Sequence, residues 1–168
     1  MTRINLVPPS TLTDQHLFAE FRELKMLPKS LNRSLQAALR REIKRTGRAS
    51  FSTHGQEAAY ESVYKNIPKH FCLGAGHVYF FYNKGAYLRT RYEVIRIELA
   101  KRGINFDRDS LFDPDDTFAQ LPDKWNQHYR PTDEALALIL QRITSRIAQK
   151  PEWYRTTAHR QPVQVAAC

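Results

Sequence analysis

Three ionisable side chains near the start of the chain are the first residues that could carry chemistry. His16, Glu20 and Glu23 are four and three residues apart, so a helix would place them on one stripe. A carboxylate there could stabilise developing positive charge and move a proton during bond cleavage. A helix glutamate is more often solvated or ion-paired. His16 could line the same site or form a structural hydrogen bond, and the sequence leaves both roles open.

Arginines form the second group of candidates. The 168 residues include 26 Lys and Arg against 17 Asp and Glu, a formal net charge of +9. That excess favours a polyanionic partner, most often nucleic acid, although a ribosome-associated or merely soluble basic protein would show it too. A cluster of arginines on one face of the protein would contact the phosphates of such a partner. Such contacts give affinity that depends on salt and not on base sequence, whereas a single surface arginine is usually only solvated.

Apolar periodicity predicts helices that would position these side chains. Thr11 or Thr13 would cap a helix from Asp14 to about Leu24, which ends before Pro28. Further helices are expected over residues 30–45, with Leu31, Leu35, Leu39 and Ile43 as the apolar stripe, and over 53–65, 84–102 and 132–149. Residues 106–129 resemble a long surface loop. The aromatic run at 79–82 could be a strand or a buried helix start, and core packing is the favoured role.

These elements predict an all-α, compact, single-domain protein in which an extended N-terminal segment leads to the active site. The domain is expected over residues 1–155, with a basic helical insertion around 30–68 and a disordered tail at 156–168. Two cysteines are too few for a disulfide framework, and no apolar run suggests a signal peptide or a membrane span. The histidines do not pair with Cys or carboxylates at ligand spacing, so we expect neither a metal nor another cofactor.

Several short sequence blocks, taken together, are more specific than any one of them. They are Thr2–Leu6, Asp14–Leu17, Ala19-Glu20, Arg22–Leu24, Leu73–Val78, Phe80–Tyr82, Lys101–Gly103, Ile147–Gln149, Pro151 and Trp153-Tyr154. In this order they resemble the pyrimidine-dimer DNA glycosylases and apurinic/apyrimidinic lyases of the phage endonuclease V type. The resemblance covers most of the chain.

The resemblance implies a helical repair enzyme whose partner is double-stranded DNA containing ultraviolet photoproducts. It implies kinking of the DNA and extrusion of the adenine opposite the dimer. The enzyme would cut the N-glycosyl bond of the 5′ pyrimidine and then break the strand by β-elimination through an imine. We expect a cytoplasmic monomer that acts on chromosomal or viral DNA.

The resemblance also assigns residues. The catalytic pair would be Glu23 and the α-amine of Thr2 once Met1 is removed; without the resemblance, Thr2 would be expected in a frayed terminus. An α-amine has a reference pKa of about 7.7–8.0, well below that of lysine, and nearby cations lower it further. The DNA-binding residues would be Arg3, His16, Arg22, Lys25, Arg142, Arg146, Trp153 and Tyr154. Trp153 and Tyr154 could stack on a base or pack against the last helix. The Gly74-Ala75-Gly76 turn is expected to be structural and to pack near the N-terminal segment.

Two departures from the phage form affect specificity. The segment between Glu23 and Gly74 is longer, and its helix carries several basic residues that could lie beside DNA or be merely solvated. Met26 stands where the family has an arginine, so that charge has moved to Lys25 or been lost. Two alternatives therefore stay open: the same imine chemistry on a different damaged base, and a non-catalytic DNA-binding relative.

Overall fold

The computed structural model describes residues 4–47, 53–74 and 76–158. Its elements are η1 (Pro9–Thr11), α1 (Asp14–Thr46), α2 (Thr53–Lys65), α3 (Gly76–Phe80), α4 (Gly85–Lys101), η2 (Asp123–Trp125) and α5 (Asp133–Gln149). Within these described ranges the regular structure is helical, with one isolated bridge between Lys84 and Asn126 and no strand. The all-α prediction is confirmed.

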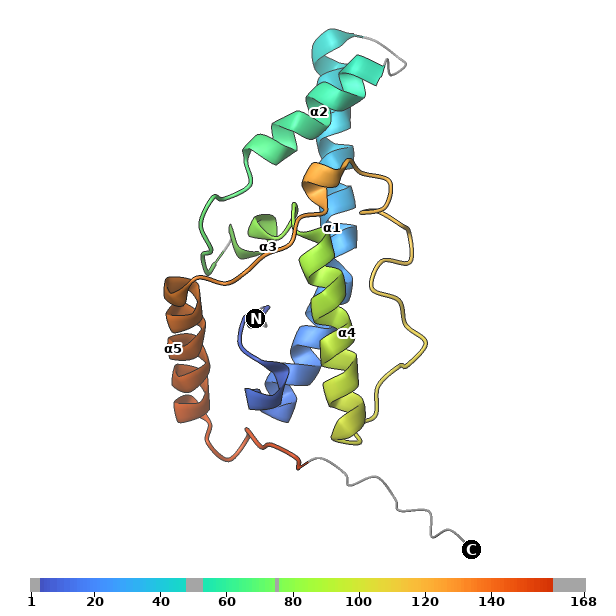
Figure 1. Ribbon diagram of the computed structural model, residues 1–168. Helices are drawn as coiled ribbons and strands as arrows, with labels where there is room; N and C mark the ends of the chain where they lie inside the picture. Colours follow the sequence, from blue (N-terminus) through green and yellow to red (C-terminus); the bar gives the residue numbers. More distant parts are fainter. Residues whose placement is uncertain (1–3, 48–52, 75, 159–168) are drawn as a thin grey trace, which may run out of the picture.

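Helix α1 forms the long axis of the molecule (Figure 1). Helix α2 packs against its second half and α4 against its first half, while α5 lies to one side with the N-terminal segment between them. Thr13 caps the start of α1 and Gly47 ends it with a φ of 65°. Among the described residues, no helix has the length and apolar character needed to cross a membrane.

The expected break in α1 at Pro28 is wrong. The helix continues through Pro28 as one element of 33 residues. A proline within a helix removes one N–H donor and costs about 3 kcal/mol. Here Pro28 lies on the buried face, and Leu24, Leu27 and Leu31 are each no more than 2% exposed. Burying one leucine stabilises a fold by about 1.5–3 kcal/mol, so this packing offsets the missing hydrogen bond.

The segment from 106 to 129 is irregular apart from η2, as expected of a loop, but it does not lie only at the surface. Phe112, Phe118, Leu121 and Trp125 are all buried in the core. Asp113 holds the segment by accepting hydrogen bonds from the backbone N–H groups of residues 117 and 118. Four apolar anchors separated by polar residues lack a helical period, which is why the pattern suggested a loop at the surface.

The remaining helices agree with the predicted ranges to within a few residues. Gly103 follows α4 with a φ of 65°, the conformation that glycine adopts most easily after a helix. Phe80, Phe81 and Tyr82 are buried, so the core role expected for the aromatic run is confirmed for these three, whereas Tyr79 is 47% exposed.

Candidate active site

A cavity of about 290 Å³ lies between the start of α1, the second half of α5 and the segment that follows α5. Its lining residues are Gln15, His16, Ala19, Arg142, Arg146, Trp153 and Tyr154. Five of these were expected at the DNA interface from the sequence, and they come from segments more than 120 residues apart. The structure therefore brings two arginines, a histidine and an aromatic pair together around one hollow.

The segment after α5 is fastened to the first turn of α1. The Gln15 side chain donates to the carbonyl of Trp153 at 2.6 Å and accepts from the N–H of Arg155 at 3.1 Å. The Asp14 N–H donates to the carbonyl of Arg155, and Thr157 donates its hydroxyl to the Asp14 carboxylate at 2.6 Å. These bonds hold the wall of the cavity that carries the aromatic pair. Residues 159–168 of the expected tail lie outside the described residues.

His16 both lines the cavity and forms structural contacts. Its ring stacks on Tyr154 with centroids 4.6 Å apart and planes 5° apart. Its Nδ1 lies 2.8 Å from the hydroxyl oxygen of Thr13, the N-cap of α1. Burial lowers the pKa of His16, and the charge of Arg142 lowers it further. His16 is therefore neutral at neutral pH and presents a flat, uncharged surface beside the arginines.

A chain of buried polar contacts connects the cavity with the N-terminal segment. Arg142 donates to the Oδ1 of Asn5 at 3.4 Å, and the Asn5 amide donates to Glu20 at 3.0 Å. Glu20 is fully buried and pairs with Arg91 at 2.8 Å. Burial raises the pKa of Glu20, and its contacts with Arg91 and Asn5 oppose that rise. Arg91 also donates to the carbonyl of Val7 at 2.7 Å, so the pair holds the N-terminal segment in place.

We expect the buried pair to be important for stability. Replacing Glu20 with alanine leaves the charge of Arg91 buried without its partner, which typically costs 3–5 kcal/mol. The control is Glu93→Ala, which removes a surface partner of Arg96 and should cost at most about 1 kcal/mol. Urea unfolding followed by circular dichroism measures both. Equal losses for the two variants would show that the buried pair has no special role in the fold.

The N-terminal segment is anchored two residues after Thr2. The N–H of Ile4 donates to Nε2 of His77 at 3.0 Å, and Nδ1 of His77 lies 3.2 Å from the carbonyl of Cys72. Residues 4–7 are all buried. A Cβ at Gly76 would lie 2.7 Å from the Cys72 sulfur, so a larger residue here would require the Cys72 side chain to shift. His77, which follows Gly76, contacts Ile4, so the end of the glycine turn lies next to the N-terminal segment. Thr2 and Arg3 lie outside the described residues.

Glu23, Arg22 and Lys25 lie farther along α1. Glu23 is half-buried and follows one turn after Ala19, so it continues the helix face that lines the cavity. Arg22, three residues after Ala19, is exposed. Lys25 lies on another side of the helix, where its ammonium group is 4.6 Å from the centre of the Phe21 ring. The structure therefore does not bring Lys25 to the cavity, and it leaves Met26 58% exposed at the position of the family arginine.

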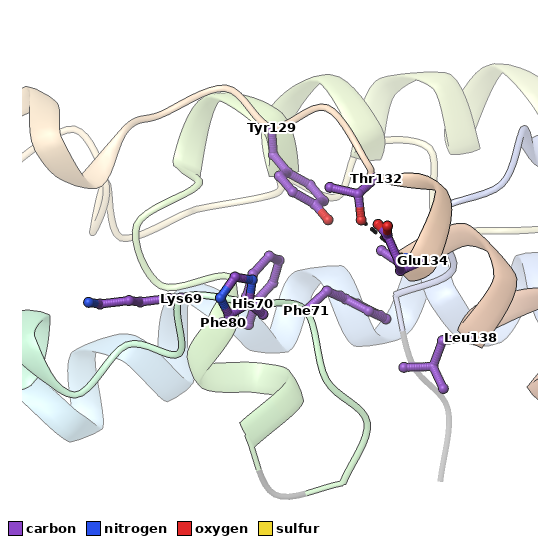
Figure 2. Close-up of a pocket in the computed structure, with 9 residues that line it drawn as sticks. Lys69, His70, Phe71, Phe80, Tyr129, Thr132, Glu134 and Leu138 are labelled. Atoms are coloured by element: carbon purple, nitrogen blue, oxygen red, sulfur yellow. Dashed lines mark hydrogen bonds between the residues drawn. The ribbon is translucent and has the colours of Figure 1, made fainter.

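A second cavity, of about 470 Å³, lies on the other side of the N-terminal segment, between the start of α5 and the turn before α3 (Figure 2). Its lining residues include Lys69, His70, Phe71, Phe80, Tyr129, Thr132, Glu134 and Leu138. Phe71 packs edge-on against His77, with centroids 5.3 Å apart. His77 therefore links this aromatic cavity to the anchor of Ile4. No residue of this second cavity was predicted as functional, because its members are scattered apolar and aromatic side chains without a motif.

An all-helical protein with arginines and aromatic side chains around one open hollow has the features of a nucleic-acid-binding protein. A comparison with known families identifies a family within that class. Residues 1–112 match the family described as pyrimidine dimer DNA glycosylase. The match covers about two thirds of the chain, and the chain belongs to this family. The matched residues include the N-terminal segment and α1, whereas the arginines of α5 and the aromatic pair lie beyond them.

Proposed function

We propose that this glycosylase acts on cyclobutane pyrimidine dimers in duplex DNA and also cleaves the strand as a lyase. The observation that carries the proposal is the anchoring of the N-terminal segment. Ile4 is fixed by His77, and Asn5 contacts Arg142 in the wall of the basic cavity. Two residues span at most about 7 Å, so this anchor limits how far Thr2 can lie from Ile4. The segment that begins at Ile4 is therefore held beside the residues suited to bind DNA, which supports a role for the amine two residues earlier.

The nucleophile in this proposal is the α-amine of Thr2 after removal of Met1. The neutral amine attacks C1′ of the 5′ nucleotide, and the pyrimidine leaves with the electrons of the N-glycosyl bond. Loss of a proton from the nitrogen and opening of the sugar ring give an imine. Removal of a proton from C2′ then expels the 3′ phosphate by β-elimination, and water releases the protein from the sugar. The reference pKa of an α-amine, about 7.7–8.0, leaves a useful fraction neutral at physiological pH.

Glu23 is the proposed partner of the amine. A carboxylate near C1′ stabilises the positive charge that develops as the base leaves, and it can move the protons required for elimination. Its position one turn after Ala19 keeps it on the cavity face of α1. Arg3, Arg22, Arg142 and Arg146 are the proposed phosphate contacts. Trp153, which is 64% exposed, offers a free aromatic surface for a sugar or an unstacked base.

Borohydride trapping tests the proposal directly, because it reduces an imine to a stable amine. The substrate is a duplex with one thymine dimer, and mass spectrometry verifies that the protein begins at Thr2. We expect a covalent adduct and strand cleavage at the dimer, with neither on the undamaged duplex. An adduct only with another damaged base would favour the alternative specificity, for which Met26 in place of the family arginine is the specific reason. Specific binding without an adduct would indicate a non-catalytic relative.

The phosphate contacts predict a measurable dependence on salt. Replacing Arg142 or Arg146 by glutamine should reduce the slope of log affinity against log salt by about one unit each on undamaged duplex. Fluorescence anisotropy across a salt series measures the slopes. Arg89→Gln on α4 is the matched control, since Arg89 is exposed and outside the cavity. Slopes that match the control would remove these arginines from the DNA interface.

A further inference from the structure

The exposed face of α1 carries a row of residues that are mostly basic. Positions 22, 26, 29, 33, 40 and 44 are spaced by three, four or seven residues, so they share one side of the helix. All six are exposed, and they lie opposite the buried leucines. Five of the six are cations. We call this set the basic track: Arg22, Lys29, Arg33, Arg40 and Lys44.

The track begins at the candidate active site. Gln15 and Ala19 line the 290 Å³ cavity and are the preceding members of the same row. Because α1 continues through Pro28, the cavity and the far end of the track belong to one helix. The second half of that helix is braced by α2, whose Ala59 and Val63 are buried in the core (Figure 1). The basic residues are therefore held in a fixed register relative to the cavity.

The charge of the track is not neutralised within the described part of the protein. No Asp or Glu occupies a position of the row, and the ion pairs among the described residues include none of its five cations. Arg45 differs, because it pairs with Glu42 at 2.6 Å. An open hollow lined by Met26, Lys29, Asn32 and Arg33 lies on the track. A row of like charges attracts a linear polyanion.

We propose that the basic track is a second DNA-binding surface, which contacts phosphates of the duplex on one side of the lesion. The proposal rests on the proposed function, in which the cavity holds the damaged nucleotide. At about 1.5 Å per residue, Lys44 lies about 38 Å along the helix from Ala19. Phosphates of one strand are spaced about 3.4 Å along the duplex axis, so a track that runs parallel to that axis spans about 11 base pairs. Phosphate contacts add affinity and fix orientation without reading sequence.

The far end of the track gives the sharpest test, because Arg40 and Lys44 lie outside the cavity. The variant Arg40→Glu/Lys44→Glu reverses two charges there. Lys65→Glu/Arg89→Glu makes the same change in net charge on exposed positions of α2 and α4. Binding is measured on duplexes with one reduced abasic site, which cannot form an imine. The arm on either side of that site is about 5 or about 15 base pairs long, and the two arm lengths are varied separately. Circular dichroism verifies that both variants are folded.

We expect the wild type and the control to bind at least about tenfold more tightly when the arm on one side is long, and to be insensitive to the other arm. The track variant should lose this dependence and bind the long duplex as weakly as the short one. If the track variant weakens binding no more than the control does, or if arm length has no effect on the wild type, the track does not bind DNA.

The two proposals fail in different ways in these measurements. Trapping by the wild-type protein on dimer-containing DNA reports the imine chemistry. Without that adduct the proposed function fails, and the salt and length dependence on undamaged duplexes of about 10 and 30 base pairs still tests the track. A trapped adduct together with no arm dependence overturns the track alone.

Discussion

A protein whose α-amine at Thr2 is blocked will form no borohydride-trapped adduct above background. Acetylation converts the amine to an amide, which has no nucleophilic electron pair. Retention of Met1 instead moves the amine by one residue, about 3.3–3.6 Å along an extended chain. The anchor at Ile4 is the reason to expect that this shift of the amine reduces trapping. Ile4 is buried and its N–H is bonded to His77, so retention of Met1 places three residues instead of two between the amine and this anchor.

The comparison uses proteins that begin at Met1, at Thr2 or at an acetylated Thr2, each verified by mass. Affinity for a duplex with a reduced abasic site should remain similar among the three, because the arginines of the cavity are unchanged. Equal trapping by all three would show that another amine reacts.

The rival amine that the structure singles out is Lys84, because burial lowers its pKa to about 8. However, its Nζ donates to the carbonyl of Phe80 at 2.7 Å and to Asn83 at 2.8 Å, and only 8% of the residue is exposed. A group held in this way cannot reach a sugar in DNA. Trapping by the blocked protein that disappears in Lys84→Arg would show otherwise and would overturn the assignment to Thr2.

The helices could be predicted because each carries its own local signal. Leu31, Leu35 and Leu39 repeat every four residues and are all buried. Thr13 caps α1 as its side chain allows, accepting a hydrogen bond from the N–H of His16. The break at Pro28 was wrong because the local preference of proline was outweighed by leucines packed in the core, and that packing depends on partners elsewhere in the chain.

The candidate site was predictable in its members but not in its geometry. The family resemblance identified His16, Arg142, Arg146, Trp153 and Tyr154, and the structure places all five around one cavity. The stacking of His16 on Tyr154 required knowledge of how the segment after α5 returns to α1. No local sequence pattern can indicate a contact between residues that are 138 positions apart, such as His16 and Tyr154.

The role of Glu20 shows the same limit. Glu20 shares a helical stripe with Glu23, and only the family resemblance selected Glu23 as the reactive carboxylate. The structure separates them, because Glu20 is fully buried against Arg91 whereas Glu23 is half-buried on the cavity face. The partner of Glu20 lies 71 residues away, so only the fold could assign it to the core.

Replacing Glu23 with glutamine is expected to reduce the single-turnover rate of glycosylase action by about 10²–10⁴-fold, the usual contribution of a positioned acid–base group. The amide keeps the size of the side chain but removes the charge that would stabilise the sugar as the base leaves. Glu57→Gln on α2 is the matched control, since Glu57 is exposed on another helix and should leave the rate unchanged. Affinity for damaged duplex should stay within about threefold in both variants, because the phosphate contacts come from arginines. Rapid-quench measurement with the protein in excess isolates the chemical step from product release. A Glu23→Gln rate equal to that of the control would exclude Glu23 from the mechanism, even if the Thr2 amine proved to be the nucleophile.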